Sequence, residues 1–543
     1  MEKPELLAKL SDAMFSPNAT TTTADARFAL YPAGHIDAQA FASNVEAELA
    51  SLNAHVGSLS PSLPNVMLLS FPGRILRQSP AVAFEAAYAL GAYFGLSAVE
   101  PELYTDHFHE PSDEQSLDPE IEFEGAKFKS LCWAPENEGL KSETTWALRM
   151  TRVRAAWDFS AAKGKPSKGK GIVIAQPDTG ITAHPELANV EYVHQRDLIL
   201  GKNGAIDPLT YHGNPSHGTG TASVAISPET GDIVGSAPAA TLMPIRAIES
   251  VVRVSQLRVA EAIDYAVTNG AHVITMSLGG LPSISLWMAL QRAISANVIV
   301  LAAAGNCAKV VVWPARYEDC IAVAGTNSDD LPWRGSCTGP DVDISAPGEN
   351  VYRAHTELGG AGQVFSLGQG QGTSFAVALT AGVAACWLAH HGRDYLVAEA
   401  SARGESVQQM FKRLLQTTSR EPEVWDQREM GAGIVDALAL LKADLDEGRG
   451  ESAVSLLHAL PTSSIRSLAQ SSAGVSLHDI SLEQYGMELA NTILEQANRK
   501  TPTSSDVQQP EAPAAKPAEV SGTLRHVLGG LPTAEQLKTA WRL

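Results

Sequence analysis

Four polar side chains in the middle of the chain have the types that acyl transfer requires. Asp178 follows the apolar run GIVIAQ, His217 stands directly before Gly-Thr-Gly, and Ser374 lies in GTSFA at the start of a long apolar stretch. Asn306 ends the apolar run VIVLAAAGN. These residues offer a nucleophile, a base to take its proton, a carboxylate to orient that base, and an amide donor for an oxyanion.

Each of these residues also has a structural interpretation when it is taken alone. Ser374 is a typical helix N-cap, and an Asp before Thr-Gly is a common turn former. His217 is either structural or a metal ligand, but no second His or carboxylate stands at i+4, as a zinc-binding helix requires. The amide of Asn306 is equally suited to capping a turn. Catalysis therefore depends on a fold that brings the four side chains together.

Residues 144–442 have the pattern of an α/β domain with a parallel sheet. Near-continuous apolar runs predict strands buried on both faces, and amphipathic stretches at residues 255–268 and 284–295 predict helices between some of them. The expected strands read GIVIAQ, TLMPIRA, HVITMSL, VIVLAAA and CIAVAG. Ligands bind at the carboxyl ends of strands in such sheets, which is where Asp178 and Asn306 are expected.

Residues 27–104 precede this domain and predict a small, separate α+β unit. Strand RFALY is followed by a helix over residues 37–52, strands HVGSL and VMLLSF, a helix over residues 80–94 and strand LSAVEPEL. The order βαββαβ is that of a ferredoxin-like unit.

The other zones are less regular. Residues 1–26 are a polar lead, expected to be flexible, and residues 105–143 form an acidic linker that could be a processing region. Residues 443–543 contain helical pieces, notably 482–497, then a Pro/Ala-rich linker and a tail.

Composition narrows the range of partners. The 543 residues contain 44% hydrophobic residues and carry a formal net charge of -20, which argues against nucleic acid and against an anionic membrane surface. The N-terminus has no apolar run of signal-peptide length, and the longest apolar stretch, residues 375–389, is short for a membrane span. The five cysteines have no CxxC spacing and fit reduced thiols. We expect a cytoplasmic protein of bacterial type without a metal site.

Residues 144–442 resemble a subtilisin-like serine protease of the subtilase family (peptidase S8 type). PDTGI, SHGTGTAS, AAAGN and QGTSFA resemble the family segments that carry the catalytic Asp, the catalytic His, the oxyanion-hole Asn and the nucleophilic Ser. The order Asp, His, Ser is also that of subtilisin. Several intervening segments match in sequence, among them HVITMSLGG and VDISAPGENV. The fold expected is thus a subtilisin-like parallel sheet flanked by helices, preceded by the βαββαβ unit.

The resemblance implies a role for each residue. Ser374 would be the nucleophile, His217 the general base and then acid, and Asp178 the residue that holds the imidazolium, while Asn306 would donate to the oxyanion. Substrate binding would fall to two walls of a first pocket, which are Ser277, Leu278, Gly279 and Gly280 on one side and Ala303, Ala304 and Gly305 on the other. The small residues of these walls suggest room for a sizeable side chain.

The resemblance also implies a role for the N-terminal unit. Subtilases are often preceded by a βαββαβ prodomain that assists folding and inhibits the enzyme, so residues 27–104 are expected to be an intramolecular inhibitory domain. An unrelated regulatory or binding domain is the alternative, because ferredoxin-like units serve many purposes. No cofactor is expected to be required. Many subtilases bind calcium, but no ligand set can be named here.

Two segments depart from the family pattern. Gly220 stands where the His segment usually has a second His, and Ala378 and Leu379 replace the Pro-His pair that usually follows the Ser segment. Cys307, directly after Asn306, is either a thiol lining the site or a small buried residue.

Three functions stay open at this point. The leading one is a serine endopeptidase made as a self-inhibited precursor that acts on protein or peptide substrates. The second is a transpeptidase or macrocyclase with the same triad, and the third a pseudoprotease that binds peptides without cutting them. A lipase is disfavoured because Ser374 does not lie in GxSxG.

Overall fold

The computed structural model describes most of the chain. The described residues are Leu6, Leu10 and residues 25–34, 36–63, 65–72, 80–103, 132–209, 215–251, 254–307, 310–449, 461–477, 479–499, 518–531 and 534–541. The predicted flexible lead, the acidic stretch of the linker and the Pro/Ala-rich linker lie largely or wholly outside these residues.

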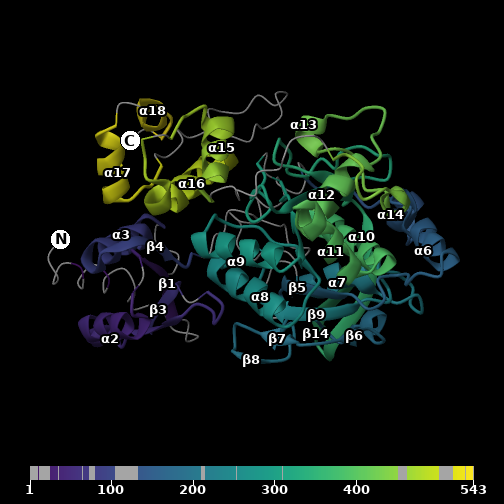
Figure 1. Ribbon diagram of the computed structural model, residues 1–543, viewed down its shortest axis with the longest axis horizontal. Helices are drawn as coiled ribbons and strands as arrows, with labels where there is room; N and C mark the ends of the chain where they lie inside the picture. The colour runs from purple at the N-terminus through teal and green to yellow at the C-terminus, as the bar shows by residue number, and fades with distance from the viewer. Residues whose placement is uncertain are drawn as a thin grey trace.

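The N-terminal unit has the predicted βαββαβ order and appears in purple and blue in Figure 1. Its four strands form an antiparallel sheet in the order β2-β3-β1-β4. The elements are β1 (Asp25–Pro32), α2 (Ala38–Glu48), the short helix η1 (Ala50–Leu52), β2 (His55–Ser58), β3 (Met67–Pro72), α3 (Pro80–Phe94) and β4 (Leu96–Pro101).

Successive side chains of β1 point to opposite faces of the sheet, and both faces are buried. Phe28 and Leu30 point into a core shared with α2 and α3. Ala29 and Tyr31, which alternate with them, belong instead to the apolar core that contains helices of the following domain. The second face of the sheet is therefore covered by the next domain rather than by solvent.

The next domain is built on a parallel sheet, and all five predicted strands lie in it. The sheet order is β13-β12-β11-β10-β5-β9-β7-β8, with β6 paired to β9. Its main strands are β5 (Val173–Asp178), β9 (Thr241–Arg246), β10 (Val273–Met276), β11 (Ile299–Ala303), β12 (Ile321–Thr326) and β13 (Ile344–Pro347). The short strands β6 (Glu191–Tyr192), β7 (Arg196–Asp197) and β8 (Lys202–Asn203) extend one edge.

Helices cover both faces of this sheet, as predicted. Helices α8 (Gln256–Thr268) and α9 (Ile284–Ser295) pack on the face that also meets the N-terminal unit. The opposite face packs on α10 (Thr373–His391) and the elements around it. These are η2 (Glu138–Leu140), α5 (Trp146–Met150), α6 (Val153–Ala162), η3 (Pro185–Leu187), α7 (His217–Ile226), α11 (Arg393–Arg403), α12 (Val407–Thr417), α14 (Ala437–Lys442) and the hairpin β14 (Val351–Gly359)–β15 (Gly362–Gly370). The short helix α13 (Gln427–Met430) instead contributes Met430 to the core that contains α8 and α9.

Helix α10 is the central helix of the domain. It contacts β10, β11, β12 and β13, and its side chains are buried almost from end to end. Among the residues that the structure describes, α10 is the one helix long and apolar enough to cross a membrane, and its apolar window lies wholly inside the protein.

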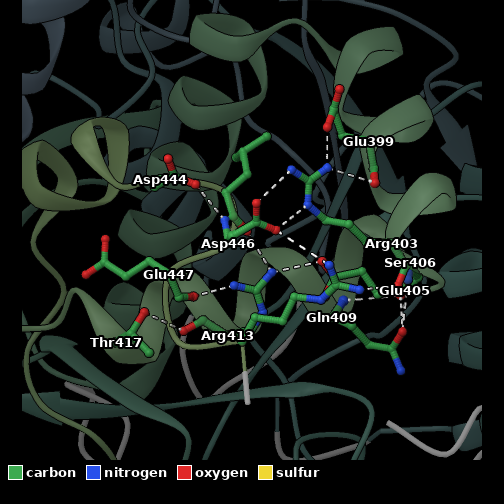
Figure 2. A network of polar contacts seen from close by, with 12 residues as sticks. Glu399, Arg403, Glu405, Ser406, Gln409, Arg413, Thr417, Asp444, Asp446 and Glu447 are labelled. Carbon is green, nitrogen blue, oxygen red and sulfur yellow. Dashed lines mark hydrogen bonds and ion pairs between the residues drawn. The ribbon is translucent and has the colours of Figure 1, made fainter. Parts of the chain in front are cut away.

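A polar network ties α11 and α12 to the chain that follows α14 (Figure 2). Arg403 Nε donates to Asp446 Oδ1 at 2.8 Å, and Arg413 donates to Glu405 at 2.8 Å and to the carbonyl of Leu445 at 2.9 Å. Residues 444–449 thus pack with the α/β domain, just beyond the predicted boundary at residue 442.

The C-terminal part contains the last four described helices, drawn in yellow-green and yellow in Figure 1. They are α15 (Pro461–Ala473), α16 (Leu482–Arg499), which confirms the predicted helix, α17 (Gly522–Gly529) and α18 (Glu535–Trp541). Helix α16 contacts α3 and β4, and α17 contacts α3.

Candidate active site

Asp178 and His217 meet at the carboxyl end of the central strand. Asp178 is the last residue of β5 and His217 the first of α7, and both are buried. His217 Nδ1 lies 2.8 Å from Asp178 Oδ1, and the other carboxylate oxygen accepts a hydrogen bond from Thr221 at 3.2 Å. The backbone N–H of Thr179 also donates to Oδ1, at 2.7 Å. A carboxylate held in this way keeps the Nδ1–H tautomer of the imidazole, whose Nε2 can accept a proton.

Ser374 is the second residue of α10. At this position the backbone N–H has no acceptor within the helix and lies at the positive end of the helix dipole. The residue is held against β10, because the Ser277 hydroxyl donates to the Ser374 carbonyl at 2.9 Å. The Ser374 hydroxyl itself lies 3.5 Å from the Ser277 carbonyl, which is a long contact. The helix thus presents both a hydroxyl and an N–H at its first turn.

Asn306 follows β11 and is oriented by the residue before Ser374. Its Oδ1 accepts two hydrogen bonds from Thr373, one from the backbone N–H and one from the hydroxyl, each 2.9 Å long. The Thr373 hydroxyl in turn accepts the N–H of Gly305 at 3.2 Å. These bonds leave the NH₂ group of Asn306 turned away from Thr373. The sequence analysis did not single out Thr373, although its place beside Ser374 in GTSFA was a usable signal.

Gly372 keeps space open between two donors. A Cβ atom at this position would lie 3.4 Å from Asn306 Nδ2 and 3.6 Å from the Ser374 nitrogen. Its φ of +154° is also one that side chains rarely adopt. An oxyanion that accepts a hydrogen bond from each of these donors would occupy the place that such a Cβ atom would take.

A pocket of about 390 Å³, including its open mouth, adjoins these groups. Its lining includes five of the seven residues predicted to bind substrate, together with Val251, Asn306, Val312, Thr373 and Ser374; the five are Ser277, Leu278, Gly279, Ala303 and Gly305. Gly280 and Ala304 do not line it. They hold its walls instead, because Gly280 N donates to the Trp313 carbonyl at 2.8 Å and the Ala304 carbonyl accepts from Val312 N at 3.1 Å.

Val312 narrows this pocket. A Cβ atom added to Gly279 would lie 2.3 Å from Val312 Cγ2, and one added to Gly305 would lie 3.1 Å from the same methyl group. The methyl group therefore stands between the two glycine walls. The prediction of room for a sizeable side chain considered the glycine and alanine walls alone, and the structure adds Val312 to the lining. The sequence did not reveal Val312, because the run VVVW is typical of any buried segment.

The described chain resumes at residue 132, and its first residues lie beside the segment that precedes Ser374. Ala134 N donates to the side chain of Gln371 at 2.9 Å, and Asn137 N donates to Gln369 at 2.7 Å. Residues 132–143, which were predicted as linker, thus pack on the α/β domain. Here a hydrogen bond with the Cys307 side chain lowers the pKa of the buried Cys132 thiol. Cys307 is therefore a half-buried thiol close to the site rather than a fully buried apolar residue.

Within the described part of the chain, no group of three or more His, Cys, Asp and Glu side chains is arranged to hold a metal ion. The groups that the structure brings to this site are the hydroxyl and backbone N–H of Ser374, the imidazole of His217 with the Asp178 carboxylate, and the side-chain amide of Asn306.

Comparisons with known proteins point to one family. The model of the subtilase family (Peptidase_S8) matches residues 169–433. A thermostable alkaline protease from Halalkalibacterium halodurans is 30% identical over 340 residues, which cover 59% of this chain and 86% of that protein. The chain belongs to the subtilase family. Thermitase of Thermoactinomyces vulgaris is 34% identical to this subtilase over 261 residues, covering 48% of this chain and 86% of thermitase.

Family membership confirms two predictions: the subtilisin-like fold and the activity of a serine endopeptidase. Fervidolysin from Fervidobacterium pennivorans, described as a keratinolytic enzyme related to subtilisin, has a similar fold. Its TM-score is 0.54 at 19% identity, and the match covers 78% of this subtilase and 62% of that chain.

The two departures from the family pattern have structural explanations in this subtilase. Gly220 packs against the hairpin, since a Cβ atom there would lie 3.3 Å from both the Ala354 carbonyl and Arg353 Cδ. Ala378 and Leu379 are completely buried in α10, within the apolar core beneath the sheet. Neither departure replaces Ser374, His217 or Asp178.

Proposed function

We propose that this subtilase cleaves peptide bonds through an acyl-enzyme on Ser374. The Ser374 hydroxyl attacks the scissile carbonyl carbon while His217 takes its proton, and His217 returns that proton to the leaving amine as the C–N bond breaks. A water molecule, deprotonated by His217, then attacks the acyl carbon and releases Ser374. Asp178 orients the imidazole and stabilises its charged form.

The oxyanion of each tetrahedral intermediate would be held by Asn306 Nδ2 and the Ser374 N–H. The support for this role is the pair of 2.9 Å bonds from Thr373 to Asn306 Oδ1, which set the amide so that its NH₂ faces away from Thr373. Donors fixed before the reaction stabilise developing charge without reorganisation. The observation that carries the proposal is the orientation of the Asn306 amide by Thr373. This amide lies in one pocket with Ser374, and the Asp178–His217 pair completes the set of groups.

The preferred substrates would be proteins or peptides with a small residue before the cut bond. Val312 supports this, because its methyl group stands between Gly279 and Gly305, the walls that would receive that side chain. An alanine-sized side chain fits above this methyl group, whereas an aromatic ring would meet it.

The N-terminal unit would act as an inhibitory domain of a self-inhibited precursor. Two carboxylates at the end of β4 support this role because they cap the two helices that the unit covers. Glu100 accepts hydrogen bonds from Ser283 Oγ and Ile284 N, both 2.8 Å, at the start of α9. Glu102 accepts from the hydroxyl of Ser255, the N-cap of α8. Hydrogen-bond acceptors at a helix N-terminus satisfy N–H groups that have no acceptor within the helix.

Labelling with a fluorophosphonate probe tests the nucleophile. We expect the wild-type protein to be labelled, Ser374→Ala to lose all labelling and His217→Ala to lose most of it. Ser401→Ala, an exposed serine of α11, is the matched control and should label normally. Labelling of Ser374→Ala at wild-type strength would refute the assignment. Hydrolysed rather than ligated or cyclised products would separate the endopeptidase from a transpeptidase.

A further inference from the structure

The C-terminal helices contact both other parts of the molecule. In Figure 1, α15–α18 lie over α3 and β4 of the N-terminal unit and extend toward α9 of the catalytic domain. Side chains of all three parts belong to one continuous apolar core. The C-terminal part is thus packed into the junction between the N-terminal unit and the catalytic domain.

Buried polar contacts join the C-terminal part to the N-terminal unit. Glu488 of α16 is 1% exposed, and it accepts a hydrogen bond from the hydroxyl of Tyr88 in α3 at 2.7 Å. The same carboxylate accepts the N–H and hydroxyl of Ser521 at 2.6 and 2.9 Å, which joins α16 to the start of α17. The ring of Tyr485 lies edge-on to Tyr88, with the ring centroids 5.1 Å apart.

In a second contact the carboxylate belongs to the N-terminal unit and the donors belong to the C-terminal part. Glu85 of α3 accepts the N–H and the hydroxyl of Thr523, each at 2.9 Å, in the first turn of α17. Each side therefore contributes one carboxylate: Glu488 receives a donor from the N-terminal unit, and Glu85 receives donors from the C-terminal part. These two contacts on α3 hold α16 through Glu488 and α17 through Thr523.

Other contacts join the C-terminal part to the catalytic domain. Trp313 Nε1 donates to Ser464 Oγ of α15 at 3.0 Å. Arg316 is 3% exposed, and it donates to the Ser464 carbonyl at 3.3 Å and to the Ser467 hydroxyl at 3.3 Å, while it pairs with Asp341 at 3.0 Å. A buried guanidinium with several acceptors is well satisfied and would be costly to expose unpaired.

The three parts also meet around one small cavity. It is lined by Phe84 and Val99 of the N-terminal unit, Ile284 and Tyr317 of the catalytic domain, and Ile465, Leu482 and Met487 of the C-terminal part. Close to this point Gln256 of α8 donates to the Pro101 carbonyl at 2.9 Å and approaches Met487 Sδ at 3.9 Å. The N-terminal unit is therefore enclosed between the catalytic domain on one side and the C-terminal part on another.

We propose that helices α15–α18 are a clamp that holds the N-terminal unit on the catalytic domain after the chain between them has been cut. The proposal rests on the inhibitory role proposed above for the N-terminal unit. Without the clamp, the unit is held by its own contacts with α8 and α9, including those of Glu100 and Glu102. With the clamp, it is held by those contacts together with the bonds of Tyr88 and Glu85, so a single cut leaves the enzyme latent.

The test uses the full chain with Ser374→Ala, an N-terminal affinity tag, and a site for a foreign protease inserted between residues 105 and 131. After the cut, the rate at which the untagged remainder washes off an affinity resin reports how firmly the unit is held. We expect Tyr88→Phe with Thr523→Val to raise this rate about tenfold or more, because the pair removes one buried and one partly buried hydrogen bond across the contact.

Tyr93→Phe is the matched control. It removes a hydroxyl from the same helix, but that hydroxyl bonds to Glu48 at 2.7 Å, within the N-terminal unit. The release rate of this control should equal that of the parent, which is the tagged Ser374→Ala protein without further substitutions. Thermal unfolding of each uncut variant checks that the fold is intact, and both substitutions of the double variant preserve shape.

Two results can be told apart. If Tyr88→Phe with Thr523→Val releases the unit at the parental rate, the clamp is refuted, whatever the role of the unit. If the same cut in the protein with Ser374 gives full activity while the unit stays bound, the inhibitory role is refuted and the clamp remains as a structural contact. If the cut protein retains the unit and has low activity, and the double variant loses the unit faster with a matching rise in activity, both the clamp and the inhibitory role are supported.

Discussion

The Nδ1 atom of His217 lies 2.8 Å from Oδ1 of Asp178, and the two residues are 39 positions apart in the chain. This contact joins the end of β5 to the start of α7 in the interior of the protein. It fixes which imidazole nitrogen carries the proton, and the first prediction follows from it.

Asp178→Asn should lower kcat by about 10⁴-fold, the size of the effect in other triad proteases, with a small change in KM. The amide can donate to Nδ1 and so favours the tautomer in which His217 cannot accept the proton of Ser374. Steady-state kinetics measures the loss, and thermal unfolding checks the fold. A kcat within about tenfold of wild type would mean that Asp178 does not orient the base.

Asn306→Ala should lower kcat by about 10²- to 10³-fold, the magnitude known for loss of one oxyanion donor in subtilisin. Thr373→Val should give a smaller loss in the same direction, because it removes one of the two bonds that orient the Asn306 amide. KM should change little in both cases, since the donors act on the transition state.

Thr380→Val is the matched control for Thr373→Val. Thr380 is buried in the same helix, and its hydroxyl bonds to the Ala376 carbonyl at 2.8 Å, away from the site. Its kcat should equal that of wild type. Equal losses in the two threonine variants would attribute the effect of Thr373 to the helix rather than to Asn306.

Gly372→Ala should abolish measurable turnover. The added methyl carbon would lie 3.4 Å from Asn306 Nδ2 and 3.6 Å from Ser374 N, in the space assigned to the oxyanion. Binding of an uncharged substrate peptide to the variant, measured in the Ser374→Ala background, separates a blocked oxyanion site from a collapsed pocket. Wild-type turnover in Gly372→Ala would show that the oxyanion binds elsewhere.

Val312→Gly should widen the choice of substrate. The loss of the methyl group between Gly279 and Gly305 opens the base of the pocket, so kcat/KM for a phenylalanine before the cut bond should rise at least about tenfold relative to alanine. Val311→Ala, a neighbouring buried valine that does not line the pocket, is the control. An unchanged preference in Val312→Gly would place the selectivity in another part of the cleft.

Association of the N-terminal unit should weaken as pH rises. Burial raises the pKa of Glu100 despite opposing hydrogen bonds from Tyr31, Ile284 and Ser283, so the bound state favours the neutral acid. The contribution of Glu100 to the association of the unit is complete below the ordinary Glu pKa of about 4.3. It is lost as the pH rises through the raised pKa of Glu100 in the bound state. Tyr31 and Tyr317, which neighbour Glu100, also have raised pKa values through burial.

The release assay described for the clamp measures this dependence between about pH 4 and about pH 8. Glu100→Gln, which stays neutral, should release the unit with a flatter pH profile than the parent. Burial also raises the pKa values of Glu261 and Glu488, so some dependence should remain. Identical profiles for the two proteins would show that Glu100 does not titrate in this range.

Much of the fold could be predicted from the sequence, because its signals are local. Strands β5, β9 and β11 are apolar on both faces and read as continuous runs, and α3 and α9 begin and end at the predicted residues. The family, the fold and the endopeptidase activity are confirmed by the comparisons. The catalytic roles of the individual residues, the domain boundaries and the cytoplasmic location stay predictions.

Other features depend on contacts between residues far apart in the chain, which no local pattern marks. Glu100 caps a helix that begins 184 residues later, and Tyr88 meets an acid 400 residues away. Val312 is one of several apolar residues in its segment, and only its position between two glycines gives it a role. Gly280 and Ala304 were expected in the pocket lining because their segments resemble those that wall the pocket in the family, but their backbones hold the walls instead.

The burial of α10 along its whole length constrains how this enzyme can be controlled. Ser374 and Thr373 occupy its first turn, and Thr373 holds Asn306, so the proposed nucleophile and the proposed oxyanion donor share one support inside the core. Moving that support would disrupt packing on five strands of the sheet, β5 and β10 to β13. The chemical groups are therefore assembled once, at folding, and any later switch has to act on whether a substrate can reach them.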